Sequence, residues 1–351
     1  MKRFILTIVL LICTLVPASR AQQPSPAPAP STFGDTLKSA EAGNAEAQYK
    51  LGGMYYKGTK AVSSDKVKAV MWYQKAAAQG HAAAQYRLGD LYYDGDGVGK
   101  DRSEAAKWFK AAADRGYAWA EYRLGKLYLD GSGVPRSVSE AMKWYVTAAG
   151  HGNAKALYAL GNMYYRGQDV PQDKVEAAKW YKAAAELGDT EARYRLALMY
   201  YDGNGIPRDT AEAVRLFDEV LKRDGDRWAK TILAAERGDA KAQYELGGMY
   251  SRGEQVSRNP AEAINWYRKA ADQGYAKAQY QLGRTYHGRR DGAGDMTEAV
   301  KWYTAAASQD HVDAQYTLGK MYHEGKVVGR NYLEAFKWYR KAAANGSKDA
   351  V

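Results

Sequence analysis

Cysteine is almost absent from this sequence, and there is only one long apolar run. Cys13 is the single cysteine among 351 residues, and it lies within that run, residues 4–16. The run is too short to span a bilayer, but it follows two basic residues and precedes a small-x-small motif that ends at Ala21. This arrangement predicts a cleaved secretory signal peptide over residues 1–21. The mature chain then contains no cysteine, so its fold depends on a packed core without disulfides.

No other segment is long and apolar enough to cross a membrane, so we predict no transmembrane segment in the mature chain. The signal peptide predicts export, with the bacterial periplasm as the expected location and secretion as the alternative. Residues 22–32 are rich in proline and alanine, which is typical of a semi-rigid extended linker.

Acidic residues are outnumbered by basic ones, but the basic excess is not concentrated. The formal net charge is +11, and it becomes +8 once the three basic residues of the signal peptide are removed. The remaining basic residues have acidic neighbours, as in RRDGAGDMTE at residues 289–298. A nucleic-acid groove gathers its basic residues on one face. We therefore predict no nucleic-acid partner and only a weak preference for anionic partners or surfaces.

The arrangements of residues that carry catalysis or bind metals are missing from the sequence. DGDGVGKDRSEA (94–105) begins like a calcium loop, but Val98 and Ala105 stand where acidic ligands are required. The GVGK within it lacks the spacing and the Ser/Thr of a phosphate-binding loop. His287 and His323 have no carboxylate or cysteine at a suitable spacing to complete a metal site. We therefore predict a non-enzyme without catalytic, cofactor-binding or metal-binding residues.

The sequence consists mainly of one unit that occurs eight times. A tyrosine recurs every 36 or 37 residues, with one longer step of 50. A tryptophan recurs with a period of 36, and Leu216 takes its place in the fifth unit. Two recurring residues in register predict a repeat protein. The repeat tyrosines are Tyr49, Tyr86, Tyr122, Tyr158, Tyr194, Tyr244, Tyr280 and Tyr316.

Each unit is predicted to form two helices. In AEYRLGKLYLDG (120–131) the apolar residues lie on one helix face, and Gly131 is expected to end the helix as a left-handed cap. In SEAAKWFKAAADRG (103–116) Ser103 is expected to cap a second helix, whose alanines and aromatic residues line its buried face. Pairs of this period bury their apolar faces by stacking. The predicted fold is therefore all-α, a solenoid of about eight antiparallel helix-pair repeats.

A glycine follows the leucine that lies two residues after each repeat tyrosine, in seven of the eight units. In the fifth unit Ala197 takes its place. Glycine inside a helix costs about 1 kcal/mol relative to alanine, whereas burying an aromatic ring contributes about 4–5 kcal/mol by area. We therefore predict that each of these glycines lets an aromatic ring of a neighbouring helix pack closely.

The repeat pattern also sets the expected domain boundaries. The step of 50 residues contains an insertion, which is expected to break the stacking into five units and three. Trp228 is interpreted as the anchor of a hinge or docking element there, or as part of a tolerated helical insertion. The predicted segments are a signal peptide (1–21), a linker (22–32), a capping helix (33–44), repeats one to five (45–224), the insertion (225–238), repeats six to eight (239–346) and a tail (347–351).

The motifs AWAEYRLGKLYLDG (118–131) and EAMKWYVTAAGHG (140–152) make a family resemblance specific. Residues 44–346 resemble the Sel-one-like repeat family, relatives of the tetratricopeptide repeats. The resemblance implies a right-handed α-solenoid that serves as an adaptor for other proteins in bacterial export, envelope signalling or host contact. A branch with paired cysteines is associated with β-lactam binding, but no repeat here contains a cysteine.

Residues that recur build the stack, so candidate binding residues are those at which the units differ. Trp119 and Leu198 replace polar residues on the solvent face of a first helix, and Leu157 replaces the usual glutamine before the tyrosine. Related solenoids place the first helix on the concave surface, so we predict an apolar patch there. Packing of Trp119 onto a neighbour is the alternative. The predicted partner-binding residues are Trp119, Arg123, Lys126, Leu157, Arg195, Leu198 and Trp228.

The function predicted from these features is a non-catalytic exported adaptor that holds an envelope or secreted protein on its concave surface. The alternative is an accessory protein that binds cell-wall or exported polysaccharide through an aromatic ladder seven residues after each repeat tyrosine. Sealing of the helix–loop junction by these rings is a further interpretation, and the oligomeric state is left open. The ladder column reads Tyr56, Tyr93, Leu129, Tyr165, Tyr201, Ser251, His287 and His323.

Overall fold

Helices account for all the regular secondary structure in the described part of the chain. The structure is a computed structural model that describes residues 32–224, 227–288, 295–325 and 329–350. These ranges contain eighteen α-helices and no strand. The predicted all-α fold is confirmed, whereas the predicted signal peptide and residues 22–31 of the predicted linker lie outside the described residues.

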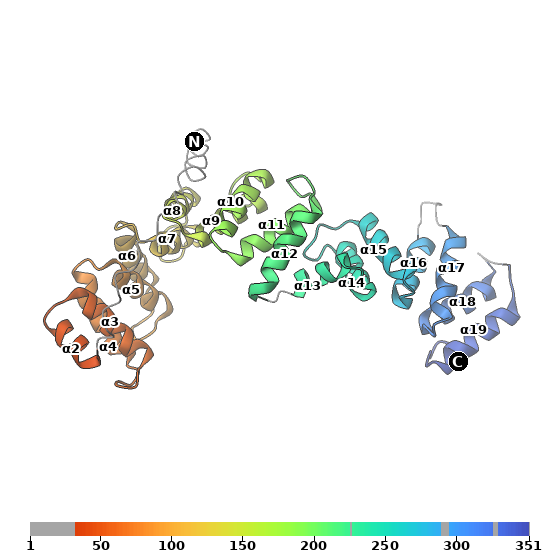
Figure 1. Ribbon diagram of the computed structural model, residues 1–351, viewed down its shortest axis with the longest axis horizontal. Helices are drawn as coiled ribbons and strands as arrows, with labels where there is room; N and C mark the ends of the chain where they lie inside the picture. The colour runs from red at the N-terminus through yellow and green to blue at the C-terminus, as the bar shows by residue number, and fades with distance from the viewer. Residues whose placement is uncertain (1–31, 225–226, 289–294, 326–328, 351) are drawn as a thin grey trace. The chain divides into compact units, whose positions relative to one another are not determined.

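First and second helices alternate along the chain (Figure 1). The first helices are α3 (Ala45–Lys57), α5 (Ala82–Asp94), α7 (Ala118–Asp130), α9 (Ala154–Arg166), α11 (Thr190–Asp202), α14 (Ala240–Arg252), α16 (Ala276–His287) and α18 (Val312–Glu324). The second helices are α4 (Lys66–Ala78), α6 (Arg102–Ala113), α8 (Val138–Gly150), α10 (Lys174–Glu186), α12 (Thr210–Asp224), α15 (Pro260–Asp272), α17 (Met296–Ala307) and α19 (Tyr332–Ala344). Two helices fall outside this alternation, α2 (Phe33–Glu41) and α13 (Arg227–Glu236).

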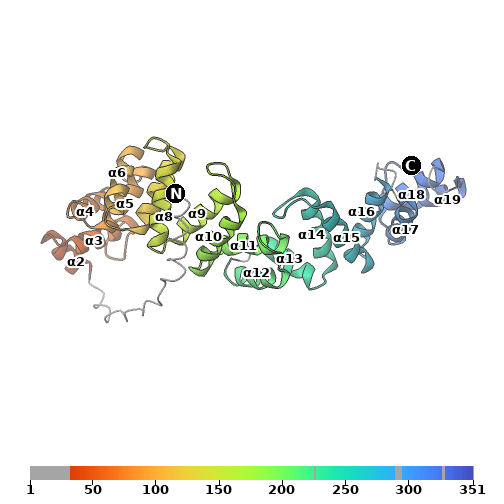
Figure 2. The same cartoon turned by 90° about the horizontal axis from the view of Figure 1, so that it is seen from above.

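The chain divides into two compact units, the first ending at Arg193 and the second beginning at Tyr194. In the first unit α2 packs on α3, and each later first helix packs on the second helix of its own repeat and on that of the preceding repeat (Figure 2). The same alternation runs from α13 to α19 in the second unit. Each unit is therefore a stack of helix pairs, as expected of an α-solenoid.

The unit boundary differs from the break that the sequence led us to expect at the insertion. The boundary lies inside α11, whereas the helix of the insertion, α13, belongs to the second unit. There α13 packs against α14 just as α2 packs against α3. The insertion thus supplies a helix where a second helix belongs, and the stacking continues through it.

Side-chain caps explain where the second helices begin. Asp65 and Asp173 each accept a hydrogen bond from the backbone amide three residues later. The expected Ser103 cap is wrong, because Asp101 precedes α6 and its Oδ1 accepts from the amides of Ser103 and Glu104 at 2.9 Å. The expected left-handed cap is confirmed at Gly131, which has φ 66° at the end of α7.

The glycines of the first helices lie against aromatic rings, as predicted. A Cβ atom built on any of the seven would lie 2.5–2.8 Å from a ring carbon of the second helix in the same repeat. In the fifth repeat, where alanine takes the place of the glycine, Ala197 and Phe217 are both fully buried. Absence of a side chain therefore sets how closely the two helices approach. The pairs are Gly52–Tyr73, Gly89–Phe109, Gly125–Tyr145, Gly161–Tyr181, Gly247–Tyr267, Gly283–Tyr303 and Gly319–Tyr339.

Burial in these contacts changes the acidity of the tyrosines. Removal from water raises the pKa of Tyr73, which rests on Gly52, to about 12. Tyr86, the repeat tyrosine of α5, lies beside Phe109 and not against a glycine, and burial raises its pKa to about 12 as well. Both side chains therefore keep their protons at a pH where an exposed tyrosine is ionised.

Gly125→Ala is expected to lower the free energy of unfolding by about 1–3 kcal/mol, because the new methyl group overlaps the Tyr145 ring. Gly150→Ala is the matched control at the end of α8. No atom lies within 4 Å of its Cβ position, so this change is expected to raise the free energy by up to about 1 kcal/mol. Urea denaturation followed by circular dichroism measures both. Equal destabilisation by the two changes would contradict the packing role of Gly125.

The free energy of unfolding is expected to fall as the pH rises from about 10 to 12. Tyrosines of the unfolded chain ionise near pH 10, whereas Tyr73 and Tyr86 hold their protons to about pH 12 in the folded chain. The stabilisation is thus complete below about pH 10 and is lost as the pH approaches 12. Absorbance of tyrosinate at alkaline pH measures this. Ionisation of every tyrosine near pH 10 in the folded chain would show that the rings are accessible.

Candidate functional site

Trp119 is a large aromatic side chain on the surface of the first unit. It lies in the first turn of α7, and 49% of its surface is exposed. Its ring meets Tyr122 edge-on, with centroids 6.3 Å apart and planes at 85°. Since half of the indole remains in water, packing onto a neighbour does not account for Trp119.

Arg123 and Lys126 lie on the same helix but have different surroundings. Arg123 Nη2 lies 2.8 Å from Asp90 Oδ1 on α5, and its guanidinium carbon lies 4.6 Å from the centre of the Tyr93 ring. Burial raises the pKa of Asp90, and the positive charge of Arg123 opposes this shift. Arg123 is therefore held in a contact between α5 and α7. Lys126 is exposed, and the described residues offer it no ion pair or hydrogen bond.

The predicted apolar patch is wrong for both of its leucines. Leu157 is 1% exposed and Leu198 is 6% exposed. Leu157 occupies a core position, because the glutamines that precede the repeat tyrosine elsewhere, such as Gln48 and Gln85, are buried too. Burial of a leucine side chain contributes about 1.5–3 kcal/mol, and this gain favours an inward-facing Leu198. Neither leucine is available to a partner.

The remaining predicted residues belong to the second unit. Arg195 and Leu198 lie on the part of α11 that belongs to the second unit, and Arg195 is half-buried. Trp228 is half-buried on α13, and the guanidinium carbon of Arg227 lies 5.6 Å from the centre of its ring. Of the predicted set, Arg123 and Lys126 share α7 with Trp119.

The predicted aromatic ladder is largely used for packing. Tyr201 is fully buried, and its Oη donates a hydrogen bond to Glu236 Oε1 at 2.5 Å. Burial raises the pKa of Tyr201. Tyr165 packs on Tyr181, and His287 on Tyr303, with ring centres 6.3 and 6.1 Å apart. These contacts favour the interpretation that the rings seal the helix–loop junction.

A buried polar bridge between repeats was missed from the sequence. Gln279 Nε2 donates to the carbonyl of Ala271 on the preceding second helix at 3.1 Å, and its Oε1 accepts from Gln309 at 2.7 Å. In the third repeat this pair becomes Glu121, which is 1% exposed, and His151, whose Nδ1 lies 2.9 Å from both carboxylate oxygens. The recurring glutamine and a polar partner thirty residues later were the available signal. The helix that carries Trp119 thus also departs from the repeat pattern inside the core.

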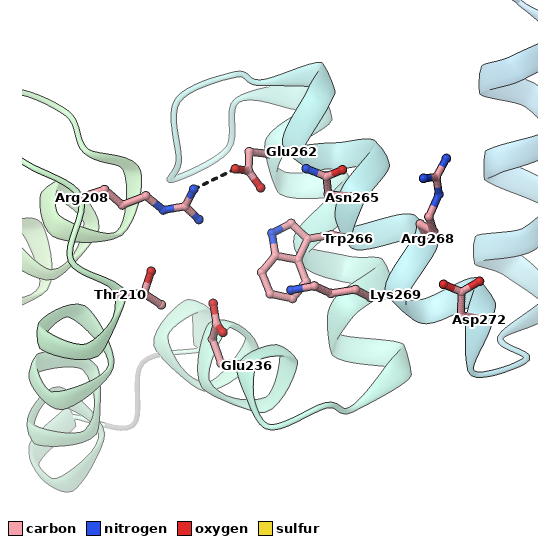
Figure 3. Close-up of a pocket in the computed structure, with 9 residues that line it drawn as sticks. All are labelled: Arg208, Thr210, Glu236, Glu262, Asn265, Trp266, Arg268, Lys269 and Asp272. Atoms are coloured by element: carbon pink, nitrogen blue, oxygen red, sulfur yellow. Dashed lines mark hydrogen bonds and ion pairs between the residues drawn. The ribbon is translucent and has the colours of Figure 1, made fainter.

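A surface pocket of about 430 Å³ lies in the second unit (Figure 3). Most of its charged groups already have partners. Arg208 Nη1 lies 2.8 Å from Glu262 Oε1, Glu236 accepts from a buried tyrosine, and Lys269 Nζ lies 3.7 Å from the centre of the Trp266 ring. A polar ligand would have to displace these contacts, so we assign it none. The lining residues are Arg208, Thr210, Glu236, Glu262, Asn265, Trp266, Arg268, Lys269 and Asp272.

The described residues contain neither a membrane-spanning helix nor a group of metal ligands. Among the described helices, none combines the length and apolar character needed to cross a membrane. Nor do three or more His, Cys, Asp or Glu side chains of these residues come together as a metal-ligand group. The feature that indicates the protein family is therefore the repeated helix pair.

The sequence matches the model of one repeat family in all eight units. The chain belongs to the Sel1-repeat family. Sel1-repeat proteins are generally non-catalytic scaffolds for protein interactions, and the resemblance noted from the sequence is confirmed. The Sel1 matches cover residues 45–81, 82–117, 120–153, 154–189, 190–219, 240–275, 276–311 and 312–347.

Solved structures of bacterial proteins resemble this Sel1-repeat chain. One is c5321, a protective antigen of uropathogenic Escherichia coli strains that displays the same repeat fold, with 33% identity and a TM-score of 0.55 over 91% of this chain and 73% of that one. Another is a Sel1-repeat protein of Oxalobacter formigenes, with 30% identity and a TM-score of 0.44 over 91% and 88%. No curated protein matches the sequence.

Leu198→Ser is expected to lower the free energy of unfolding by about 3–5 kcal/mol, because it removes a buried side chain and buries a hydroxyl group. Trp119→Ser is expected to lower it by about 1 kcal/mol or less, since half of the indole is in water. Urea denaturation of both variants measures the difference. A larger loss for Trp119→Ser than for Leu198→Ser would place the tryptophan in the core.

Proposed function

We propose that this Sel1-repeat protein is an exported, non-catalytic adaptor that binds another protein on the first-helix surface around Trp119. The observation that carries the proposal is the 49% exposure of this indole. Tryptophan is enriched among the residues that contribute most to binding between proteins. A half-exposed indole on a helix that is held firmly by its neighbours is a suitable anchor for a partner.

The neighbouring repeats leave room for a partner beside Trp119. The equivalent residues of the second and fourth repeats are Ala83, which has a small side chain, and Lys155. Lys155 Nζ lies 3.1 Å from Asp189 and 3.0 Å from Glu191, so its charge is already balanced. Lys126 lies one helical turn beyond Arg123 on α7, and its side chain is exposed. The preferred partner segment therefore has an apolar residue for the indole and an acidic residue for Lys126.

Export of this adaptor is supported by the N-terminal sequence, which has the features of a signal peptide. One relative with a solved structure is a protective antigen of uropathogenic Escherichia coli strains. We therefore propose a partner in the bacterial envelope or among secreted proteins, in envelope signalling, export or host contact. The concave surface expected of the first helices is the proposed docking face.

The polysaccharide alternative depended on an exposed ladder of rings. Tyr201 is buried, and Tyr165 and His287 pack on the aromatic rings of their own repeats. No observation on the described residues therefore favours polysaccharide over protein.

Trp119→Ser is expected to abolish or strongly weaken capture of the partner in bacterial cells, since the central anchor is lost. A photo-crosslinking residue placed at position 83, the equivalent of Trp119 in the second repeat, identifies the captured protein. Leu187→Ser is the matched control, because Leu187 is 46% exposed in the same unit but lies at the end of α10. Equal capture with Trp119→Ser and with the original chain would rule out this surface.

A further inference from the structure

Three large apolar side chains are exposed together on the last helix. Tyr332, Leu333 and Phe336 of α19 are 60%, 66% and 62% exposed. They lie within five residues of one another, whereas the other exposed large apolar residues of the described chain occur singly or in a pair. A contiguous exposed apolar cluster of this kind is typical of a surface that binds another protein.

The position of Phe336 is buried in three other repeats and half-buried in the remaining four. The equivalent residues of α4, α6 and α10 are Val70, Ala106 and Ala178, which are 5–6% exposed. The first helix of the following repeat covers α4 and α6, whereas none of the described residues covers α19 in this way. The exposed face of α19 is thus a continuation of the interface by which the repeats stack.

The exposed face also has a self-complementary order of residues. Tyr332, Phe336 and Arg340 are spaced by four, so they form one stripe along α19. Two such stripes that run antiparallel about a twofold axis at Phe336 place ring on ring at the centre. They also place each Arg340 beside the Tyr332 ring of the other copy, where a guanidinium is attracted to the aromatic face. Arg340 is exposed, and no ion pair or hydrogen bond within the described residues occupies it.

We propose that α19 is a dimerisation surface, which pairs with α19 of a second copy of this chain. The equivalent stripes of the other second helices lack this order, as in Lys66–Val70–Gln74 of α4 and Lys174–Ala178–Lys182 of α10. At the other end of the chain, α2 already covers α3, with Ala40 and Thr36 buried in the contact. The helix α3 is therefore not free to cover α19 of another copy, and the self-complementary stripe favours a closed twofold dimer.

The test is sedimentation equilibrium of the full chain. The original chain is expected to have twice the mass of one copy at micromolar concentration, and Phe336→Ser is expected to raise the dimer dissociation constant by about tenfold or more. Val67→Ser is the matched control, because Val67 is 68% exposed at the position of α4 that corresponds to Leu333. It is expected to leave the dimer unchanged.

An exchange of residues tests the register of the pair. Tyr332→Arg alone places two arginines opposite each other, at position 332 of one copy and position 340 of the other, and is expected to weaken the dimer. Tyr332→Arg combined with Arg340→Tyr recreates a tyrosine–arginine pair and is expected to restore the dimer. Circular dichroism of each variant shows that α19 remains folded. A monomeric original chain at about 50 µM, a dimer that Phe336→Ser leaves unchanged, or a failure of the double exchange to restore pairing would overturn the proposal. So would a monomer that instead binds another protein at α19.

Discussion

The helix pairs of seven repeats depend on one contact, in which an aromatic ring of the second helix rests on the bare backbone of the first. At seven positions the glycine has no room for a methyl group. The lost helix propensity, about 1 kcal/mol, is smaller than the gain from burying the ring. Because the same contact recurs in repeat after repeat, the surface residues can vary without disturbing the fold.

The third repeat combines the departures that distinguish it from the others. Its first helix carries the exposed Trp119, and the buried glutamine bridge becomes the Glu121–His151 pair. A carboxylate that is 1% exposed needs a compensating partner, and the imidazole supplies one at 2.9 Å. The third repeat therefore uses a carboxylate–imidazole pair where other repeats use glutamines, and it also exposes Trp119 to solvent.

The fold could be predicted from the sequence because its signal recurs eight times. Both the helix pairs and the close approach at the glycines follow from periodic residues, and the structure has them. The candidate site was harder to predict, because one sequence does not show which way a single exceptional side chain points. Leu157 is buried against expectation because its glutamine counterparts, although polar, are buried for their hydrogen bonds. Trp119 is exposed as predicted, because it lies in the first turn of α7 and its edge-on contact with Tyr122 leaves half of its surface in water.

The helix α13 gives the last three repeats a starting helix of their own. It covers α14 as α2 covers α3, so a starting helix occurs twice along the sequence. Residues from Arg227 onward thus contain a starting helix and three complete pairs, the minimum that a short solenoid needs. A genetic exchange at this point would carry a starting helix along with the last three repeats, but it would separate Glu236 and Tyr250 from their partners Tyr201 and Asp202 on α11.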